Sequence, residues 1–480
     1  MIRPLLLLVL LAGTTAAPAR AAQGRAFVFA TDFSSGTIAS VGFGPPPAAN
    51  CNVAPTCADA VLRYHQGRLY LVERFGCDNI RVLDPNAGFA VVQQFSVGNG
   101  SNPNDIVIVS PTRAFVTRYD TADLWIVHPQ TGAFVGSVSL AAFADADGIP
   151  EMNRLAVMNG RVFVTVQRVD RDLFFSPTDS SQVVVLDAAT GALIDCDPGA
   201  AGVQGILLPF QNPTTELVPD PAGRLLVGCT GAYGAPDGGI VRIDPVGLAV
   251  EAVEVTEAAL GGDVVDLAIA SPTRGFAIVG DAAFNTACRP YDRVIGSVGP
   301  PVHATSGFNL SDAEVNDRSE LWLADRTPAN PGIRVFDALT LAPLTAGPVS
   351  TCLPPQDLEF DGDRAVGIGP VASGPAAGGA VRFAGAWPNP SRGAVTLRLA
   401  LGDGFAGGTL VLTLVDAAGR RVRGLEHAVP PGAAGSEVAL NWDGRDDTGR
   451  PVAPGVYGVR MAGGLARATG RVVRLPLARL

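Results

Sequence analysis

The chain contains no lysine: all 35 basic residues are arginines, against 45 acidic residues and a formal net charge of −10. This absence excludes a lysine nucleophile, a Schiff base and a phosphate-binding loop that ends in Gly-Lys. The acidic balance argues against a nucleic-acid partner, because phosphate binding needs a basic face. Charged residues make up only 17% of the chain, whereas 57 glycines and 38 prolines supply turns throughout. Such a composition favours many short strands joined by tight connections, and so an all-β fold.

Common signatures of catalysis are also missing. The chain has only four histidines, and it contains no Cys-x-x-Cys pair, no His-Glu-x-x-His pair and no Gly-x-Ser-x-Gly elbow. Zinc sites, redox sites and nucleophilic triads therefore have no obvious set of residues. Catalysis by carboxylates stays open, so no catalytic residue is assigned and the question of enzyme activity is left undecided.

Apolar runs long enough to span a bilayer are absent, but a short one lies near the start of the chain. Arg3 provides a positive charge, residues 5–12 are apolar, and Ala19-Arg20-Ala21 offers a cleavage site of the small-x-small kind. We therefore expect a signal peptide at residues 1–21 and a mature chain without a transmembrane span. The expected location is extracellular or on the outer cell surface, with the periplasm as the alternative.

One theme recurs seven times between residues 59 and 369. An acidic or amide residue opens an apolar strand, a turn follows, and arginine often introduces a second strand. Most repeats are spaced by about 45–50 residues, which is typical of four-stranded propeller blades with strands a, b, c and d. In the second repeat these strands are expected at residues 105–109, 113–117, 123–127 and 133–140. The opening residues are Asp59, Asp105, Asn153, Glu216, Asp266, Asp312 and Asp357.

These repeats predict a seven-bladed β-propeller over residues 25–384, because a closed ring buries both faces of every blade. The first strands of the mature chain, residues 25–31 and 37–43, are expected to complete the last blade; eight blades are the alternative. The turns between strands c and d, such as Asp187-Ala188-Ala189-Thr190-Gly191, resemble those of the YVTN-type seven-bladed propellers. That resemblance implies a fold and not a function.

A different pattern covers residues 385–480, where alternating strands are separated by Gly and Pro turns. It predicts a small antiparallel sandwich with Trp442 and Tyr457 in its core and a hairpin turn at 443–449. The segments Asn389-Pro390, Trp442-Asp443-Gly444 and Gly455-Val456-Tyr457 resemble the immunoglobulin-like module of flagellar hook-capping proteins and of type IX secretion cargo. The resemblance implies an export or attachment role, with the outer-membrane secretion machinery as a partner.

Seven cysteines in an exported chain indicate disulfides and one odd thiol. By the predicted strand order, all seven lie at the end of the blades where d–a and b–c connections meet. Local bridges are expected, with Cys51, Cys57 and Cys77 close together. Three insertions, at residues 168–181, 196–213 and 280–294, are expected on the same face. The remaining cysteines are Cys196, Cys229, Cys288 and Cys352.

The seven residues that open the repeats are expected to form a rim at one mouth of the central channel. They could bind Ca²⁺ or Mg²⁺, or a cationic or hydroxylated ligand; alternatively, each accepts a backbone N–H within its own turn. The leading hypothesis is an exported binding or adhesion protein whose ligand is a protein, a glycan or a small molecule. The alternatives are a divalent-cation-dependent hydrolase or lyase of the lactonase kind, and a self-associating surface-layer component.

Overall fold

The computed structural model describes residues 24–362 except 45, and then 381–387, 394–401, 408–415, 421–430, 437–453, 455–461 and 469–474. The chain divides into two compact units, Met1–Val371 and Ala372–Leu480. The predicted signal peptide and the strand expected after Arg364 lie outside the described residues. Within the described part, no helix is long and apolar enough to cross a membrane.

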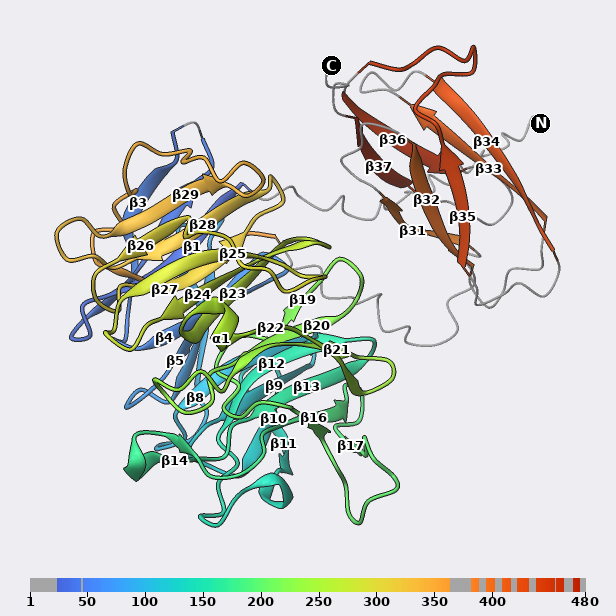
Figure 1. The fold of residues 1–480 in the computed structure, drawn as a ribbon. Helices are drawn as coiled ribbons and strands as arrows, with labels where there is room; N and C mark the ends of the chain where they lie inside the picture. The colour runs from blue at the N-terminus through green and yellow to red at the C-terminus, as the bar shows by residue number, and fades with distance from the viewer. Residues whose placement is uncertain are drawn as a thin grey trace, which may run out of the picture. The chain divides into compact units, whose positions relative to one another are not determined.

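The first unit is a seven-bladed β-propeller whose blades are antiparallel sheets (Figure 1). Blade 1 contains β4 (Ala60–His65), β5 (Arg68–Glu73), β6 (Asn79–Asp84) and β7 (Ala90–Ser96). Blade 2 contains β8 (Pro103–Ser110), β9 (Arg113–Arg118), β10 (Asp123–Val127) and β11 (Phe134–Ser139). Blade 3 contains β12 (Met152–Met158), β13 (Arg161–Val166), β16 (Gln182–Asp187) and β17 (Leu193–Ile194), and β18 (Ile206–Leu207) also pairs with β16. The four strands predicted for the second repeat are therefore confirmed.

The remaining blades follow the same order. Blade 4 contains β19 (Val218–Pro219), β20 (Leu225–Cys229), β21 (Gly239–Asp244) and β22 (Ala249–Thr256). Blade 5 contains β23 (Asp263–Ser271), β24 (Arg274–Gly280), β25 (Thr286–Asp292) and β26 (His303–Thr305). Blade 6 contains β27 (Leu310–Val315), β28 (Glu320–Asp325) and β29 (Gly332–Asp337). Short elements in the connections are η1 (Ala141–Phe143), β14 (Val169–Asp170), η2 (Arg171–Leu173), β15 (Ser176–Pro177) and α1 (Glu257–Leu260).

Blade 7 closes the ring by joining the two ends of the propeller. Its inner strand is β30 (Pro355–Phe360), and its outer strands are β1 (Arg25–Thr31), β2 (Gly36–Gly42) and β3 (Ala48–Thr56). Val28 pairs with Leu358 in the antiparallel contact between β1 and β30. The predicted completion of the last blade by the first strands is confirmed, and the ring has seven blades and not eight.

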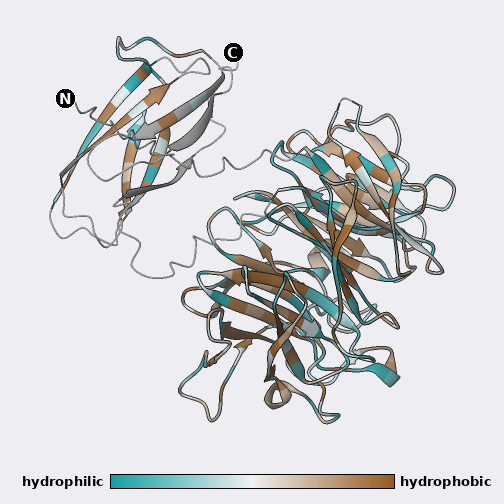
Figure 2. Cartoon of the chain, turned by 180° about the vertical axis from the view of Figure 1, so that it is seen from behind, coloured by the Kyte–Doolittle hydropathy of each residue, from teal (hydrophilic) through white to brown (hydrophobic). Residues whose placement is uncertain are grey.

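Burial explains why these segments form blades. The second strand of a blade, such as β5, is buried almost throughout, whereas the outer strand β11 alternates between exposed and partly buried residues. Neighbouring blades share one core: Val72 of blade 1 packs in the same cluster as Ile106 and Val116 of blade 2. Apolar residues accordingly concentrate in the strands in Figure 2. A blade alone would leave such surfaces in water, so the ring is the stable arrangement.

The two ends of the blades differ in their connections. We call the end with the d–a and b–c connections the loop face, and the end with the a–b and c–d turns the turn face. At the turn face, the arginine that opens strand b contacts the following blade. Arg161 donates to the carbonyl of Pro245 at 2.7 Å, and Arg274 donates to that of Leu339 at 2.6 Å. The same kind of contact joins Arg25 to Asn86 at 2.7 Å and Arg318 to the carbonyl of Phe43 at 2.9 Å.

The second unit contains two antiparallel sheets. One has β31 (Val381–Trp387), β32 (Val395–Leu401) and β35 (Glu437–Trp442). The other has β34 (Arg421–Val429), β33 (Gly408–Val415), β36 (Gly455–Met461) and β37 (Thr469–Arg474). Residues of both sheets form one core, in which the rings of Trp442 and Tyr457 meet edge to face at 5.3 Å. Sequence analysis placed residues 381–384 at the end of the propeller, but β31 pairs with β32 in this unit.

Candidate functional site

The inner strands bring the repeated carboxylates to the central channel. Four of them accept a hydrogen bond from a backbone N–H of the next blade's inner strand, and Asp105 also accepts one from Ile106 of its own strand. Asp266 accepts from Ala313 at 2.8 Å, and Asp312 accepts from Leu358 at 2.5 Å. The same contact joins Asp105 to Leu155 at 2.8 Å and Asp357 to Leu62 at 2.7 Å. These four residues thus connect blade 2 to 3, 5 to 6, 6 to 7, and 7 to 1.

Two arginines share the channel with these carboxylates. Arg63 forms ion pairs with Asp105 at 2.8 Å and with Glu216 at 2.5 Å, and so joins the second and fourth repeats. Arg154 donates to the carbonyl of Asn104 at 3.5 Å, while its buried Nε has no hydrogen-bond partner. The repeat pattern contained no sign of either arginine, because each occurs in one blade only. A basic residue within an otherwise apolar inner strand was the available signal.

Burial and mutual repulsion raise the pKa of several of these carboxylates. Burial raises the pKa of Asp266 to about 7 and that of Asp357 to about 6. Burial and the neighbouring Asp266 and Asp357 raise the pKa of Asp312 well above its usual value. Nearby Arg63 and Arg154 act in the opposite direction on Asp357, because a positive charge stabilises the ionised carboxylate.

Two of the predicted rim residues, Asp59 and Asn153, have other partners. Asp59 precedes β4, is partly exposed, and forms an ion pair with Arg74 at 3.5 Å. Asn153 is buried, accepts from the side-chain amide of Asn104 at 3.0 Å, and donates to the carbonyl of Pro213 at 3.2 Å. The channel therefore gathers Asp105, Glu216, Asp266, Asp312 and Asp357, while Asp59 and Asn153 stand apart from this charge cluster.

The carboxylates are oriented toward backbone amides and arginines. Among the described residues, no three His, Cys, Asp or Glu side chains are grouped so that they could hold a metal ion. Cation binding in the channel stays a prediction.

A cavity of about 910 Å³ extends from the channel toward the turn face. Arg63, Glu216 and Glu359 line its channel end, and His65 and Gln130 line it at the turns of blades 1 and 2. Its walls also include Val107, Val109 and Val157 of the inner strands. The cavity therefore combines an apolar wall with polar groups at both ends, which is the usual character of a small-molecule pocket.

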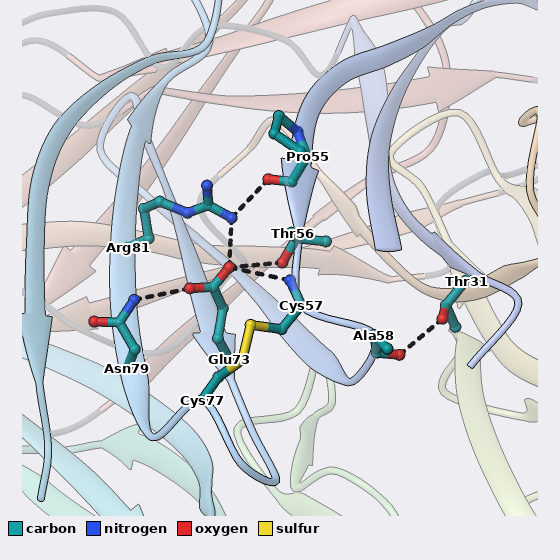
Figure 3. The surroundings of a disulfide bond; sticks show 9 residues. All are labelled: Thr31, Pro55, Thr56, Cys57, Ala58, Glu73, Cys77, Asn79 and Arg81. Atoms are coloured by element: carbon teal, nitrogen blue, oxygen red, sulfur yellow. Dashed lines mark hydrogen bonds and ion pairs between the residues drawn. A yellow bond between two sulfur atoms is a disulfide. The ribbon is translucent and has the colours of Figure 1, made fainter. Parts of the chain in front are cut away.

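Two disulfides hold connections at the loop face. Cys57 pairs with Cys77, so that the d–a connection into blade 1 is linked to the b–c loop of that blade. Figure 3 shows Glu73 beside this bridge, where it accepts hydrogen bonds from Thr56, Arg81 and Asn79. A buried carboxylate surrounded by donors in this way fixes the corner of the blade.

The second disulfide joins Cys51 to Cys352 across 301 residues and links β3 to the connection before β30. Local bridging is thus confirmed for Cys57 and Cys77, but Cys51 pairs with the far end of the propeller. Both partners belong to the blade that closes the ring, which explains their proximity.

Three cysteines are free thiols, and not the single one expected: Cys196, Cys229 and Cys288. Sequence analysis placed Cys229 and Cys288 in b–c connections, but they lie in β20 and β25 and are fully buried. The fifth b–c loop is therefore only residues 281–285, because β25 continues through Arg289 and Tyr291. Burial raises the pKa of all three thiols, which keeps them protonated and unreactive.

Exposed aromatic side chains also gather on the loop face. Five of the seven b–c loops carry one or more, namely Phe33, Phe75, Phe174 with Phe175, Tyr233 and Phe284. The exposed fraction is 89% for Phe174, 61% for Tyr233 and 74% for Phe284. The insertions expected at residues 168–181 and 280–294 include three of these rings, Phe174, Phe175 and Phe284. The available signal was an aromatic residue near an aspartate in a loop between strands b and c.

Comparison with known proteins supports the fold. No protein-family model and no curated protein matches the chain. A protein of Lactobacillus plantarum matches in structure with a TM-score of 0.51 and 12% identity, over 70% of this chain and 99% of that chain.

Two weaker structural matches have described roles. PorZ of Porphyromonas gingivalis, a surface component of the type-IX secretion system, matches with a TM-score of 0.42 and 14% identity, over 92% of this chain and 64% of that chain. A streptogramin B lyase matches with a TM-score of 0.44 and 11% identity, over 64% of this chain and 90% of that chain. The chain thus spans less than two thirds of PorZ, and at these identities such likeness concerns the propeller fold and not its function.

Proposed function

We propose that the protein is an exported binding protein that engages a macromolecular partner through the loop face of its propeller. One observation carries this proposal, namely the exposed aromatic side chains on five of the seven b–c loops. Aromatic rings offer a large apolar contact area, and loops on a rigid scaffold are where binding residues concentrate. Rings that served only the stability of the fold would be buried, whereas these rings are exposed to water.

Export is supported by the signal-like N-terminus and by the two disulfides, because disulfides persist in oxidising compartments. The proposed location is extracellular or on the outer cell surface. We further propose that the second unit is an immunoglobulin-like sandwich that serves export or surface attachment through the outer-membrane secretion machinery. Its two sheets around a single core support this proposal.

Cell fractionation with N-terminal sequencing tests the location. The mature chain is expected to begin near residue 22, with the protein in the surface or extracellular fraction. A variant that ends before the second unit should accumulate in the periplasm. A full-length product in the cytoplasm with its N-terminus intact would overturn the proposal.

Site-specific photo-crosslinking tests the binding face. A photoreactive phenylalanine analogue placed at Phe284 should form an adduct with a partner in intact cells. The same analogue at Val246, an exposed residue in a c–d turn on the turn face, is the matched control. Equal labelling at both positions, or none at Phe284, would contradict a partner on the loop face.

A second candidate function is a divalent-cation-dependent hydrolase or lyase that acts in the channel. The excess of carboxylates over arginines favours it, because a cation would offset the burial and the neighbouring carboxylates that together raise the pKa of Asp312. Metal-dependent lactonase or esterase activity that disappears in Asp105→Ala and Asp266→Ala would support this function. If these variants lower only the melting temperature, the carboxylates serve to join the blades.

A further inference from the structure

We infer that the loop face recognises a basic polypeptide and captures arginine or lysine side chains between its exposed aromatic rings and neighbouring carboxylates. The inference rests on the proposed function and names the chemistry of the partner. It would account for two features of this face together, its aromatic residues and its charge.

The charge of the propeller is distributed unevenly. The described propeller, residues 24–362, holds 37 acidic residues against 19 arginines. Its d–a and b–c connections contain 16 acidic residues and four arginines, whereas the a–b and c–d turns, counted with the aspartates that open the c–d turns, contain seven acidic residues and three arginines. The negative charge in the connections therefore lies mainly at the loop face. A concentrated field of one sign steers a partner of the opposite sign and speeds its association.

Aromatic and acidic residues occur as neighbours in the individual loops. Phe284 lies in the loop that begins with exposed Asp281, and Phe174 follows exposed Asp172. Tyr233 lies in a loop whose Gly234 N–H donates to Asp263 at 2.7 Å. An aromatic ring attracts a cation through its face, and a carboxylate beside it adds an ion pair. Each loop thus provides both halves of a site for a guanidinium or ammonium group.

Two arginines of the protein itself already lie beside aromatic rings on the loop face, and one of them also pairs with a carboxylate. The guanidinium of Arg326 lies 4.4 Å from the centre of the Phe33 ring. That of Arg171 lies 5.8 Å from the centre of the Tyr119 ring and forms an ion pair with Asp120 at 2.8 Å. These contacts show that the geometry of the face suits an arginine.

The backbone holds several of the rings in a costly conformation. Phe33, Phe174, Phe175 and Phe284 all have φ between 54° and 65°, in the left-handed region that disfavours bulky residues. Aspartates fix these turns: Asp32 accepts from Ser35 N–H at 2.7 Å, and Asp281 accepts from Asn285 N–H at 2.8 Å. Backbone strain that stabilises no core is a feature of functional sites.

A second copy of the chain is the less suitable occupant. Two loop faces brought together by symmetry would place their excess of acidic residues against each other. Like charges brought together at such an interface destabilise it unless they are screened. A neutral polysaccharide would use the rings but would leave the carboxylates without a role.

Fluorescence anisotropy on the mature full-length chain tests the inference. The probe is a labelled peptide of alternating arginine and glycine, about twelve residues long. The matched control replaces arginine with citrulline, which keeps the shape and removes the charge. We expect the arginine peptide to bind at least about tenfold more tightly, and its affinity to fall when NaCl is raised from about 0.05 M to about 0.5 M.

Matched variants locate the contact. The combined change Phe174→Ala, Tyr233→Ala and Phe284→Ala should weaken binding by about tenfold or more, because each exposed cation–π contact contributes about two- to fivefold. The control removes exposed apolar side chains from the turn face, with Val246→Ala, Val294→Ala and Ile295→Ala, and should leave binding unchanged. Melting temperatures confirm that both variants are folded.

Several results would overturn the inference. These are equal binding of the citrulline peptide, an equal loss in both triple variants, or no loss in the aromatic variant. Self-association that the aromatic variant abolishes would identify a second copy as the occupant. If the arginine peptide does not bind while the analogue at position 284 still crosslinks to a partner in cells, the partner is not a basic polypeptide but the proposed binding function stands. If both fail, the proposed binding function fails as well.

Discussion

At the residue scale, the repeated acidic residue acts between blades. Asp266 and Asp312 each accept a hydrogen bond from the inner strand of the following blade, and this position requires burial of the carboxyl group. Burial favours the neutral form and thereby raises the pKa of these groups. The same side chains therefore connect blades and make the stability of the propeller depend on pH.

The first prediction concerns this pH dependence. Because the pKa of Asp266 is raised to about 7 and that of Asp357 to about 6, the folded state binds more protons than the unfolded state above their ordinary pKa of 3.8. The free energy of unfolding should therefore fall as pH rises through about 6–7, and the melting temperature should fall with it by about 2 °C or more. Thermal scans between about pH 5 and about pH 8 measure this.

Asp266→Asn supplies the control for this prediction. The amide keeps a hydrogen-bond acceptor for Ala313 but does not titrate, so the slope of melting temperature against pH should become smaller. A slope unchanged in Asp266→Asn and in Asp357→Asn would show that other groups govern the dependence. Glu151 and Glu257, whose pKa values burial raises to about 7, are the next candidates.

The second prediction concerns backbone strain. Phe284 has a φ of 59° and is 74% exposed, so its side chain contributes little to the core. Phe284→Gly should leave the free energy of unfolding unchanged or raise it by about 1 kcal/mol, because glycine adopts this conformation readily. Denaturant titration measures the change, with Phe276→Gly in a buried strand as the contrasting substitution. A clear loss of stability in Phe284→Gly would assign the ring a structural role.

At the element scale, the arginine that opens strand b explains the second part of the sequence repeat. Arg161 donates to the carbonyls of Pro245 and Val246 at 2.7 and 3.1 Å. Both carbonyls lie in the c–d turn of blade 4, so an arginine of blade 3 supplies their donor from the neighbouring blade. The periodicity of acidic residue and arginine thus reflects contacts between blades at opposite ends of the strands.

The third prediction follows from these contacts. Arg161→Ala should lower the free energy of unfolding of the propeller by about 1–3 kcal/mol, because it removes two charge-assisted hydrogen bonds. Arg450→Ala, an exposed arginine of the second unit, should change it by less than about 0.5 kcal/mol. Urea unfolding monitored by tryptophan fluorescence measures both. Equal effects would refute a role for Arg161 between blades.

At the scale of the whole molecule, ring closure joins the first and last parts of the propeller. β1 pairs with β30, and the Cys51–Cys352 disulfide links β3 to the connection before β30. This bridge spans 301 residues, whereas Cys57–Cys77 spans 20. A longer bridged segment restricts the unfolded chain more strongly, so the closing bridge should contribute more to stability.

The fourth prediction compares the two disulfides. Removal of the closing bridge by Cys51→Ser with Cys352→Ser should cost about 5 kcal/mol, against about 3 kcal/mol for Cys57→Ser with Cys77→Ser. Denaturant titrations of the two double variants under identical conditions measure the difference. A larger cost for the Cys57–Cys77 pair would show that local packing, including Glu73, outweighs the restriction of the unfolded chain.

Sequence reasoning succeeded where a local pattern was sufficient. The strands of the second repeat, the closing role of residues 25–31 and the buried Trp442 and Tyr457 follow from the alternation of apolar residues with turns. Contacts between residues that are distant in the chain could not be predicted in this way. Cys51 pairs with a residue 301 positions away, and Arg63 pairs with Glu216, a contact without periodic signal.

By itself, the sequence determined the four-stranded blades, their strand order and a second, different module, because these depend on burial patterns within each repeat; it left seven or eight blades open. Only the tertiary structure decided what the repeated residues contact. Closing the ring places Asp312 against Leu358 and Cys51 against Cys352, and it turns separate loops into one acidic, aromatic face. The physical reason is that these contacts lie between blades. The sequence pattern reflects only the burial that is required within a single blade.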